Sequence, residues 1–411
     1  MDKVLIIGAV WPEPKSSAGG SRMIQLIDFF VKDKYKVFYC SAASNEVFNV
    51  DLVVLGVEKF NVKLNDSSFD SQLEELSPDV VVFDRFMVEE QFGWRVAQVC
   101  PSAVRIIETI DLHCLRITRK EGLQDGTLVA DSIGLREKLL ENDTAKREIA
   151  AILRSDLSLM ISQAEIEILK DIFEIKENLL FYLPYKAAAK IEEVPSFQDR
   201  SSYMTIGNFK HAPNWDSVLQ IKNEIFPRIR KKHKDAKMYV YGAYADEKVF
   251  NLNNPKMGFY VLGRADDAME VMQKARVCLA PLRFGAGIKG KLVESMVCGT
   301  PNVTTSIGAE GMHGGMQWNG FVENDYDTFS DAAVCLHQDE DTWNVKQQFG
   351  FELLNNFDSK KEEALLSSRL VQVKNNLVQL RKNNFIGSML MHHTMQSTKF
   401  MSRWIELKNA K

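Results

Sequence analysis

The chain has 411 residues, of which 45% are hydrophobic and 26% charged, a balance that excludes a disordered or collagen-like chain and predicts a folded protein of two or three domains. Lys and Arg number 51 against 55 Asp and Glu, so the formal net charge is −4. Without an overall positive field, nucleic acid is not an expected partner.

In the first half, short apolar runs alternate with amphipathic stretches. Most of these runs are continuous rather than alternating, which is typical of parallel strands covered on both faces. Seven are predicted strands, at residues 4–10, 36–40, 52–57, 79–84, 104–108, 157–162 and 179–183. The segments between them, such as 21–32 and 89–99, carry apolar residues at helical spacing. This alternation predicts a doubly wound α/β domain over residues 1–185.

Residues 186–202 contain Pro195, an alanine run and mixed charges, and we interpret them as an inter-domain linker. Five further predicted strands follow, at 203–207, 238–242, 259–263, 277–281 and 302–305, which predicts a second domain over 203–384. Residues 385–411 have Met, Phe and Trp at helical spacing and are predicted to form a C-terminal helix that packs back on the body. Ligands of open α/β sheets bind at the carboxyl ends of strands, so the cleft between the domains is the expected site.

The strongest functional signal is the segment 277–301, where a predicted strand passes through a glycine-rich loop into a helix. The loop holds Gly285, Gly287, Ile288, Lys289, Gly290 and Lys291. Backbone N–H groups of such a loop approach phosphate at a helix N-terminus, and lysines add positive charge. Glu294, about one turn inside the helix, can accept both hydroxyls of a ribose. The segment therefore predicts a nucleoside diphosphate site.

This segment resembles the donor-nucleotide loop of retaining glycosyltransferases of family 4, the "glycosyl transferases group 1", which have the GT-B fold. Residues 206–214 and 304–311 resemble two further loops of that nucleotide-binding domain, and 12–22 resemble a flexible glycine loop facing the acceptor. The resemblance implies two Rossmann-like domains facing a central cleft. It implies a nucleotide diphosphate sugar as substrate, no cofactor and no metal, and a glycan, glycolipid or small-molecule acceptor in polysaccharide or glycolipid biosynthesis.

Site residues follow from the same resemblance. Donor binding is expected of Gly20, Gly207, Lys210, Gly285, Gly287, Ile288, Lys289 and Glu294. Catalytic roles are expected of His113, near the donor sugar, of Lys289, at the phosphates, and of Glu310, near the sugar hydroxyls, with a helix-capping carboxylate as the alternative for Glu310. Candidates for the acceptor side or the cleft are Arg22, Asp84, Arg85 and Asp111. Asp84 and Arg85 are equally compatible with a buried ion pair.

Two positions depart from the family's pattern. The family commonly has two glutamates separated by seven residues; Glu294 matches the second, but Ala286 stands at the first. Its usual Arg-then-Lys pair is not plainly present, and Lys210 is the basic candidate. A non-catalytic nucleotide-sugar-binding or scaffold protein with the same fold therefore stays open as the alternative. A dinucleotide oxidoreductase is disfavoured, since the first predicted strand is not followed by G-x-G-x-x-G.

Other features are given ordinary structural interpretations. The 339–341 segment spells D-x-D, a metal-binding pattern, but its polar context predicts a helix N-cap. The basic run 228–234 is predicted to be a solvated helix end, with membrane or acceptor contact as the alternative. Six scattered cysteines without C-x-x-C spacing, no long apolar run and no signal-peptide pattern predict a cytoplasmic protein. Weak peripheral contact with the inner face of a membrane stays open.

Overall fold

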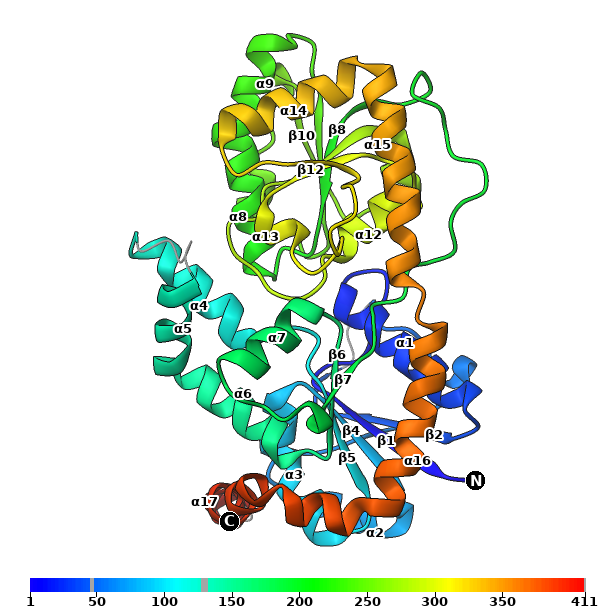
Figure 1. Ribbon diagram of the computed structural model, residues 1–411, viewed down its shortest axis with the longest axis vertical. Coiled ribbons are helices and arrows are strands. Elements are labelled where there is room, and N and C mark those ends of the chain that lie inside the picture. The colour runs from blue at the N-terminus through cyan, green and yellow to red at the C-terminus, as the bar shows by residue number, and fades with distance from the viewer. Residues whose placement is uncertain (45–47, 127–131, 410–411) are drawn as a thin grey trace.

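The structure is a computed structural model that describes residues 1–44, 48–126 and 132–409. Two parallel sheets, one from each half of the chain, lie one above the other along its long axis (Figure 1). The N-terminal sheet has the order β3-β2-β1-β4-β5-β6-β7 and the C-terminal sheet the order β10-β9-β8-β11-β12-β13. Helices cover both faces of each sheet, which confirms the predicted α/β fold of two βαβ domains.

The elements of the N-terminal domain have the following bounds. The strands are β1 (Lys3–Gly8), β2 (Lys36–Ser41), β3 (Glu58–Asn61), β4 (Val80–Asp84), β5 (Val104–Glu108), β6 (Leu157–Met160) and β7 (Leu180–Tyr182). The helices are α1 (Ala18–Lys32), α2 (Ser68–Leu76), α3 (Phe86–Val99), α4 (His113–Gln124), α5 (Ser132–Glu141), α6 (Asp143–Arg154) and α7 (Gln163–Asp171), with short 3₁₀ turns η1 (Leu52–Leu55) and η2 (Glu177–Leu179).

The rest of the chain forms the second domain and two long terminal helices. The strands are β8 (Ser201–Ile206), β9 (Met238–Tyr241), β10 (Phe259–Gly263), β11 (Ala275–Ala280), β12 (Asn302–Thr304) and β13 (Gly320–Val322). The helices are α8 (Ala212–Gln220), α9 (Phe226–Lys232), α10 (Glu247–Phe250), α11 (Ala268–Lys274), α12 (Gly290–Val297), α13 (Ser306–Ala309), α14 (Tyr326–Gln338), α15 (Glu340–Leu353), α16 (Lys360–Asn383) and α17 (Phe385–Asn409), with a π-turn η3 (Ile221–Ile225) and 3₁₀ turns η4 (Pro255–Met257) and η5 (Leu354–Phe357).

The prediction of a strand at 52–57 was wrong. The Asp51 side chain accepts a hydrogen bond from the Val53 N–H at 3.1 Å and starts a 3₁₀ turn, which Gly56 ends in the left-handed region at φ +76°. The strand comes later, as β3, at the sheet edge beside β2. An edge strand has one partner and is open to water, so its sequence, EKFN, carries no apolar run to reveal it. The edge strand β13 was also missed; with three residues, GFV, it is too short to form an apolar run.

The expected end of the second domain at residue 384 does not agree with the structure. Helix α16 returns to the N-terminal domain and runs along it (Figure 1). Its buried residues, Leu366, Leu370, Val373 and Leu377, join the core of the N-terminal sheet. Their spacing places them in one apolar stripe along α16. This stripe is buried against the apolar surface that the sheet of the N-terminal domain offers.

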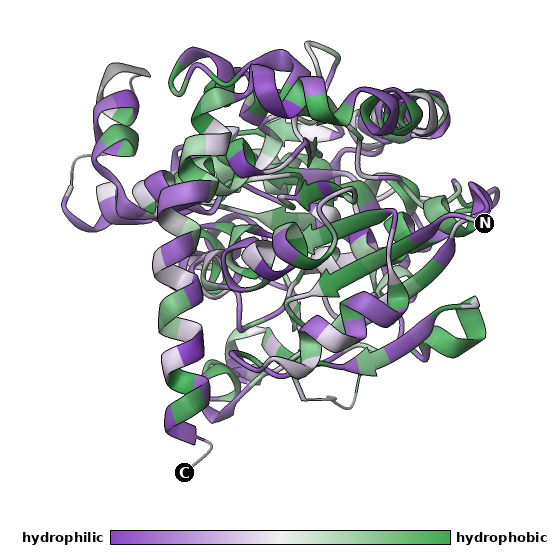
Figure 2. Cartoon of the chain, turned by 90° about the horizontal axis from the view of Figure 1, so that it is seen from below, coloured by the Kyte–Doolittle hydropathy of each residue, from purple (hydrophilic) through white to green (hydrophobic). Residues whose placement is uncertain are grey.

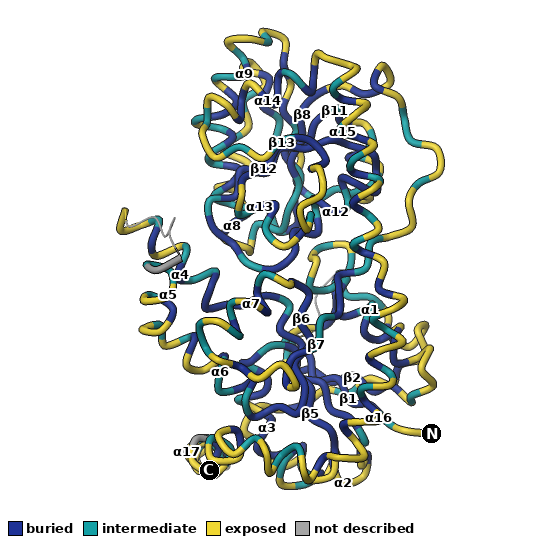
Figure 3. The backbone as a smooth tube through the Cα atoms, in the orientation of Figure 1, coloured by how far each residue is buried: buried dark blue, intermediate teal, exposed yellow. Residues whose placement is uncertain are grey.

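Helix α17 packs back on the N-terminal domain as predicted, but most of the apolar residues that predicted this packing stay exposed. Met395 and Ser402 are buried where α17 packs against α3 and α6. On the opposite face, Phe400, Trp404 and Leu407 are 63%, 58% and 70% exposed. Figure 2 shows α17 along one edge of the molecule with hydrophobic residues along it, and Figure 3 shows it mostly exposed. None of the helices in the described residues is both long and apolar enough to cross a membrane.

Candidate active site

A cavity of about 570 Å³ lies between the domains, at the carboxyl ends of both sheets. Its volume is in the range of small-molecule sites, and its position is the cleft that the sequence predicted. The N-terminal domain contributes the loops after β1, β4 and β5, and the C-terminal domain those after β8, β9 and β11. Seven basic residues line it against four acidic ones: Lys15, Arg85, Arg116, Lys210, Arg264, Lys289 and Lys291 against Glu13, Asp84, Asp111 and Glu294. This excess of positive charge favours an anionic ligand.

The loop between β11 and α12 forms one wall of the cavity, and every residue from Gly285 to Lys291 lines it. Gly287 has φ +64°, and a Cβ there would lie 2.8 Å from the Asp111 Cβ of the other domain. Glycine is thus required both by the backbone conformation and by the close approach of the two domains.

Two lysines and a glutamate of this wall carry its charge. Lys289 is buried and donates from Nζ to the Gly287 carbonyl at 2.7 Å, and burial lowers its pKa. Lys291 donates to Asn214 Oδ1 at 2.7 Å, and burial lowers its pKa to about 8. Burial raises the pKa of Glu294, and the nearby Lys291 opposes this. The three side chains that the sequence singled out therefore line one wall, as expected for a nucleoside diphosphate site.

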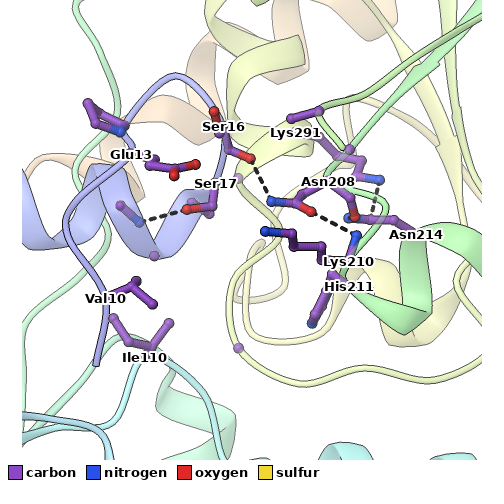
Figure 4. A pocket seen from close by; sticks show the side chains of 18 of the residues that line it. Val10, Glu13, Ser16, Ser17, Ile110, Asn208, Lys210, His211, Asn214 and Lys291 are labelled. Carbon is purple, nitrogen blue, oxygen red and sulfur yellow. Dashed lines mark hydrogen bonds between the residues drawn. The ribbon is translucent and has the colours of Figure 1, made fainter. Parts of the chain in front are cut away.

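The loop after β8 closes the cavity from the side (Figure 4). A Cβ on Gly207 would lie 2.6 Å from Asn214 Cγ, so the loop passes tightly over the start of α8. Asn208 donates across the cleft to the Ser16 carbonyl at 3.4 Å. Lys210 is exposed at the mouth, with its ammonium 3.6 Å from the centroid of the Tyr244 ring.

On the N-terminal side, His113, Asp111 and Arg116 line the cavity together. His113 begins α4, and its Nε2 lies 3.5 Å from Asp111 Oδ1. Burial lowers the pKa of His113 to about 4, so its imidazole is neutral near pH 7. Burial raises the pKa of Asp111, but nearby positive charge, chiefly that of Arg116, outweighs this and the net shift is downward. A neutral imidazole beside a carboxylate can exchange hydrogen bonds with sugar hydroxyls without adding charge.

Asp84 and Arg85 line the cavity and also form an ion pair. Arg85 donates from Nε and Nη2 to the Asp84 carboxylate at 2.9 and 3.0 Å. Asp84 further accepts from the Ala9 N–H at 3.0 Å, which ties the ends of β4 and β1 together. Asp84 and Arg85 are therefore both cavity residues and partners in an ion pair. Their role toward the acceptor stays a prediction.

Gly20 lines the cavity from a helix and not from a loop, since α1 begins at Ala18 within the segment 12–22. Gly20 lies in the first turn of α1, where its N–H donates to the N-cap Ser17 Oγ at 3.0 Å. A Cβ on Gly20 would lie 2.4 Å from the Glu13 carbonyl oxygen, so the glycine allows helix and preceding loop to approach.

Arg22 was expected at the cleft, and the structure places it elsewhere. Its side chain is buried and donates to Glu108 Oε2 at 3.1 and 3.3 Å and to the Pro184 carbonyl at 3.0 Å. It does not line the cavity. The reason is its place on α1: Arg22 lies on the buried face of this helix, within reach of the buried carboxylate of Glu108 at the end of β5.

Glu310 does not line the cavity, and its carboxylate does not cap a helix N-terminus: the residue follows α13 as its C-cap. Its carboxylate accepts hydrogen bonds from Arg119 of the N-terminal domain at 2.6 and 2.8 Å. Burial opposes ionisation of Glu310, but this bond and the charge of Arg119 lower its pKa overall. Arg119 also donates to the Gly285 carbonyl at 2.9 Å, so it holds the donor loop from the opposite domain.

Two functional candidates were missed by sequence reasoning, Arg119 and Glu165. Both contact the loop 285–291 from the N-terminal domain: Arg119 at Gly285, and Glu165 by accepting from the Gly287 N–H at 2.6 Å. Their partners lie 166 and 122 residues away along the chain. Neither belongs to a local motif, so no pattern within a short window could have indicated them.

The D-x-D segment is a helix N-cap, as predicted. Asp339 Oδ1 accepts from the N–H groups of Asp341 and Thr342 at 3.1 and 3.2 Å, at the start of α15. In the part of the chain that the structure describes, no three His, Cys, Asp or Glu side chains gather in a way that could hold a metal ion.

Comparison with known proteins adds a family and a fold. Residues 200–339 match the family model described as "Glycosyl transferases group 1". Anabaena Alr3699/HepE, solved with UDP and glucose, has 11% identity and a TM-score of 0.64 over 90% of this chain and 100% of that one. A S. aureus TarM mutant, solved with Fondaparinux, alpha-GlcNAc-glycerol and UDP, has 10% identity and a TM-score of 0.67 over 91% and 100%.

A third structure, sucrose-phosphate synthase from Thermosynechococcus elongatus, has 11% identity and a TM-score of 0.62 over 90% of this chain and 98% of that one. No curated protein matches the sequence. At these identities the structures establish the fold, and the family model covers the domain that carries the loop 285–291. Residues 200–339 therefore match the glycosyl transferases group 1 family, within a chain that has the GT-B fold.

Proposed function

We propose that the protein is a retaining glycosyltransferase, which moves a sugar from a nucleotide diphosphate sugar to an acceptor hydroxyl during polysaccharide or glycolipid biosynthesis. The observation that carries this proposal is the cavity wall that holds Lys289, Lys291 and Glu294 around a glycine-rich loop. UDP in the structures of HepE and TarM, which share the fold, supports a nucleotide as the ligand.

In the proposed reaction the bond between the anomeric carbon and the phosphate oxygen breaks, and its electron pair stays on the diphosphate. The acceptor oxygen bonds the anomeric carbon on the same face, and the acceptor proton passes to the leaving phosphate oxygen. Lys289 and the loop N–H groups stabilise the developing phosphate charge in a site shielded from water. Neutral His113 binds sugar hydroxyls. Retention rests on the family resemblance, and the metal-free reaction stays part of the proposal.

The first test is thermal stabilisation by nucleoside diphosphates and their sugars. We expect one of UDP, GDP or ADP to stabilise the protein selectively, by about 2.7 kcal/mol at a hundredfold excess over its dissociation constant. Glu294→Ala should abolish this shift, because the ribose loses its carboxylate partner. Glu352→Ala, on the exposed face of α15, is the matched control and should bind like the wild type.

The alternative is a non-catalytic nucleotide-sugar-binding or scaffold protein, and Ala286 favours it because this alanine replaces a glutamate common in the family. A measurement of turnover distinguishes the two. Hydrolysis or transfer from the donor that stabilises the protein is the expected result. Selective binding without either reaction, across glycan, glycolipid and small-molecule acceptors, would favour the scaffold. No shift with any nucleotide would overturn the donor site itself.

The proposal extends to peripheral contact of α17 with an anionic lipid surface. Its exposed face combines Phe400, Trp404 and Leu407 with the cations Arg403 and Lys408. Glu406, the one acid in residues 385–411, accepts hydrogen bonds from Ser67 at 2.6 and 2.8 Å. An apolar face flanked by cations is suited to anionic membranes, whereas pairing of two copies would bring like charges together.

The basic run 228–234 supports such contact less. Arg228 pairs with Glu224 and Asp327, and Lys232 pairs with Asp331, so acids of the same domain offset its charge.

Co-sedimentation with lipid vesicles tests the contact. The protein should sediment with phosphatidylglycerol vesicles at low salt, less so at high salt, and not with phosphatidylcholine vesicles. Trp404→Glu should remove binding, while Phe250→Glu, at an exposed phenylalanine of the other domain, should not. Equal binding by Trp404→Glu would refute the contact, as would a dimer in solution that Trp404→Glu separates.

A further inference from the structure

Glu165 connects the two domains at the donor loop. It lies in the first turn of α7 in the N-terminal domain, and its side chain is fully buried. Its Oε1 accepts from the Gly287 N–H at 2.6 Å and from the Leu112 N–H at 3.3 Å. Lys289 donates to the carbonyl of the same glycine at 2.7 Å. Gly287 is therefore held on both sides of its backbone, by a carboxyl group of one domain and an ammonium group of the other.

The second oxygen of Glu165 is unusual. Oε2 is buried and has no hydrogen-bond partner within the described residues. Burial, and next the charge of Asp111, raise the pKa of Glu165, and burial lowers that of Lys289. A buried carboxyl group with an unsatisfied oxygen is unfavourable for stability, and such groups cluster where function requires them.

The carboxyl group of Glu165 lies close to Ala286, the position at which this chain lacks the glutamate of the family's pattern. Ala286 lines the cavity at the place where the resembling loops carry a glutamate, and it packs against apolar residues of the N-terminal domain. Glu165 reaches the backbone of the very next residue, Gly287. A carboxyl group of the opposite domain thus reaches the backbone of the loop beside Ala286, although it does not itself line the cavity.

We propose that Glu165 is a positioning residue that supplies, from the N-terminal domain, the carboxyl group missing at Ala286. It orders the donor loop so that Lys289 can meet the donor. The donor site is then complete only when the two domains are closed on each other. This inference rests on the proposed transferase function, but the loop order that it requires can be measured without any donor.

The first measurement is hydrogen exchange of the amides of residues 285–291 in the full chain. Glu165→Ala should speed their exchange about tenfold or more, because the Gly287 N–H loses its acceptor. Glu165→Gln keeps an acceptor oxygen and should exchange like the wild type. Glu148→Ala is the matched control for a merely structural role. Glu148 caps the same helix, α4, by accepting from His113 and Cys114 N–H at 3.0 and 2.9 Å, but it does not touch the loop.

The second measurement is relocation of the carboxyl group. Glu165→Ala should lower kcat/KM for the donor about tenfold or more, and Ala286→Glu in that background should restore much of it. Ala286→Glu alone should impair turnover, because two carboxyl groups then face each other. Wild-type loop exchange in Glu165→Ala, or no recovery in the double variant, would overturn the role of Glu165. Absence of turnover in the wild type would contradict the proposed function alone, since the exchange experiment still decides on Glu165.

Discussion

Replacing Lys289 with alanine is expected to lower kcat for donor turnover about 100- to 1000-fold, the effect of removing one preorganised electrostatic contact. The loss is large because Lys289 is buried beside the donor loop, where water cannot screen its charge. Steady-state kinetics with the donor identified by thermal stabilisation will measure it. The unfolding temperature should not fall, since burial of the lysine is itself unfavourable. Among the described residues its ammonium group donates only to a loop carbonyl, that of Gly287.

Two further variants test whether the expected loss of kcat is specific to the ammonium group of Lys289. Lys274→Ala removes an exposed lysine of the same domain, which pairs with Glu270, and should leave kcat unchanged. Lys289→Arg keeps the charge but not the compact ammonium group, so we expect partial activity at best. Near-wild-type turnover by Lys289→Ala would show that the phosphate charge is stabilised elsewhere in the loop.

Replacing Arg22 with methionine is expected to destabilise the N-terminal domain by about 3–5 kcal/mol, because it leaves Glu108 buried without its cation. Both side chains are almost fully buried, and Arg22 makes three hydrogen bonds to Glu108 and Pro184. Urea unfolding followed by the fluorescence of N-terminal tryptophans, with the two domain transitions resolved, will measure the change.

Removing the charges of both Arg22 and Glu108 distinguishes a structural role of Arg22 in the ion pair from a role in the cleft. Arg22→Met with Glu108→Leu should regain much of the lost stability, since no uncompensated charge remains. Arg147→Met breaks the exposed pair with Glu90 and should change stability by only about 0–1 kcal/mol. If Arg22→Met keeps full stability and loses acceptor turnover, then the original expectation of a cleft residue was right and the buried pair is unimportant.

The strands of both sheets were predictable where they are buried on both faces. Such strands are continuous apolar runs, as in β1, β4 and β5, whose residues Val4, Val82 and Ile106 are fully buried. Of the four edge strands among the described residues, β7 and β10 still carry apolar runs and were predicted, whereas β3 and β13 escaped. One side of an edge strand faces water, so its sequence is free to be apolar or not.

The terminal helices show a second limit. The hydrophobic periodicity of α16 and α17 predicts a helix with an apolar face for each. It does not predict the surface on which that face packs. The apolar stripe of α16 packs on the N-terminal domain. Helix α17 buries Met395 but leaves Trp404 exposed. Periodicity is a local property, whereas docking depends on which surface the rest of the fold leaves open.

The sequence by itself determined the two α/β domains, the glycine-rich loop 285–291 with its lysines, and Glu294 one turn into the helix, because these features are written in residues close together along the chain. Only the tertiary structure decided that Arg22 is a buried ion-pair residue and that Arg119 and Glu165 hold the donor loop. These contacts join residues 86 to 166 positions apart. Their partners are chosen by packing of the two domains, which brings charges together that no local pattern relates.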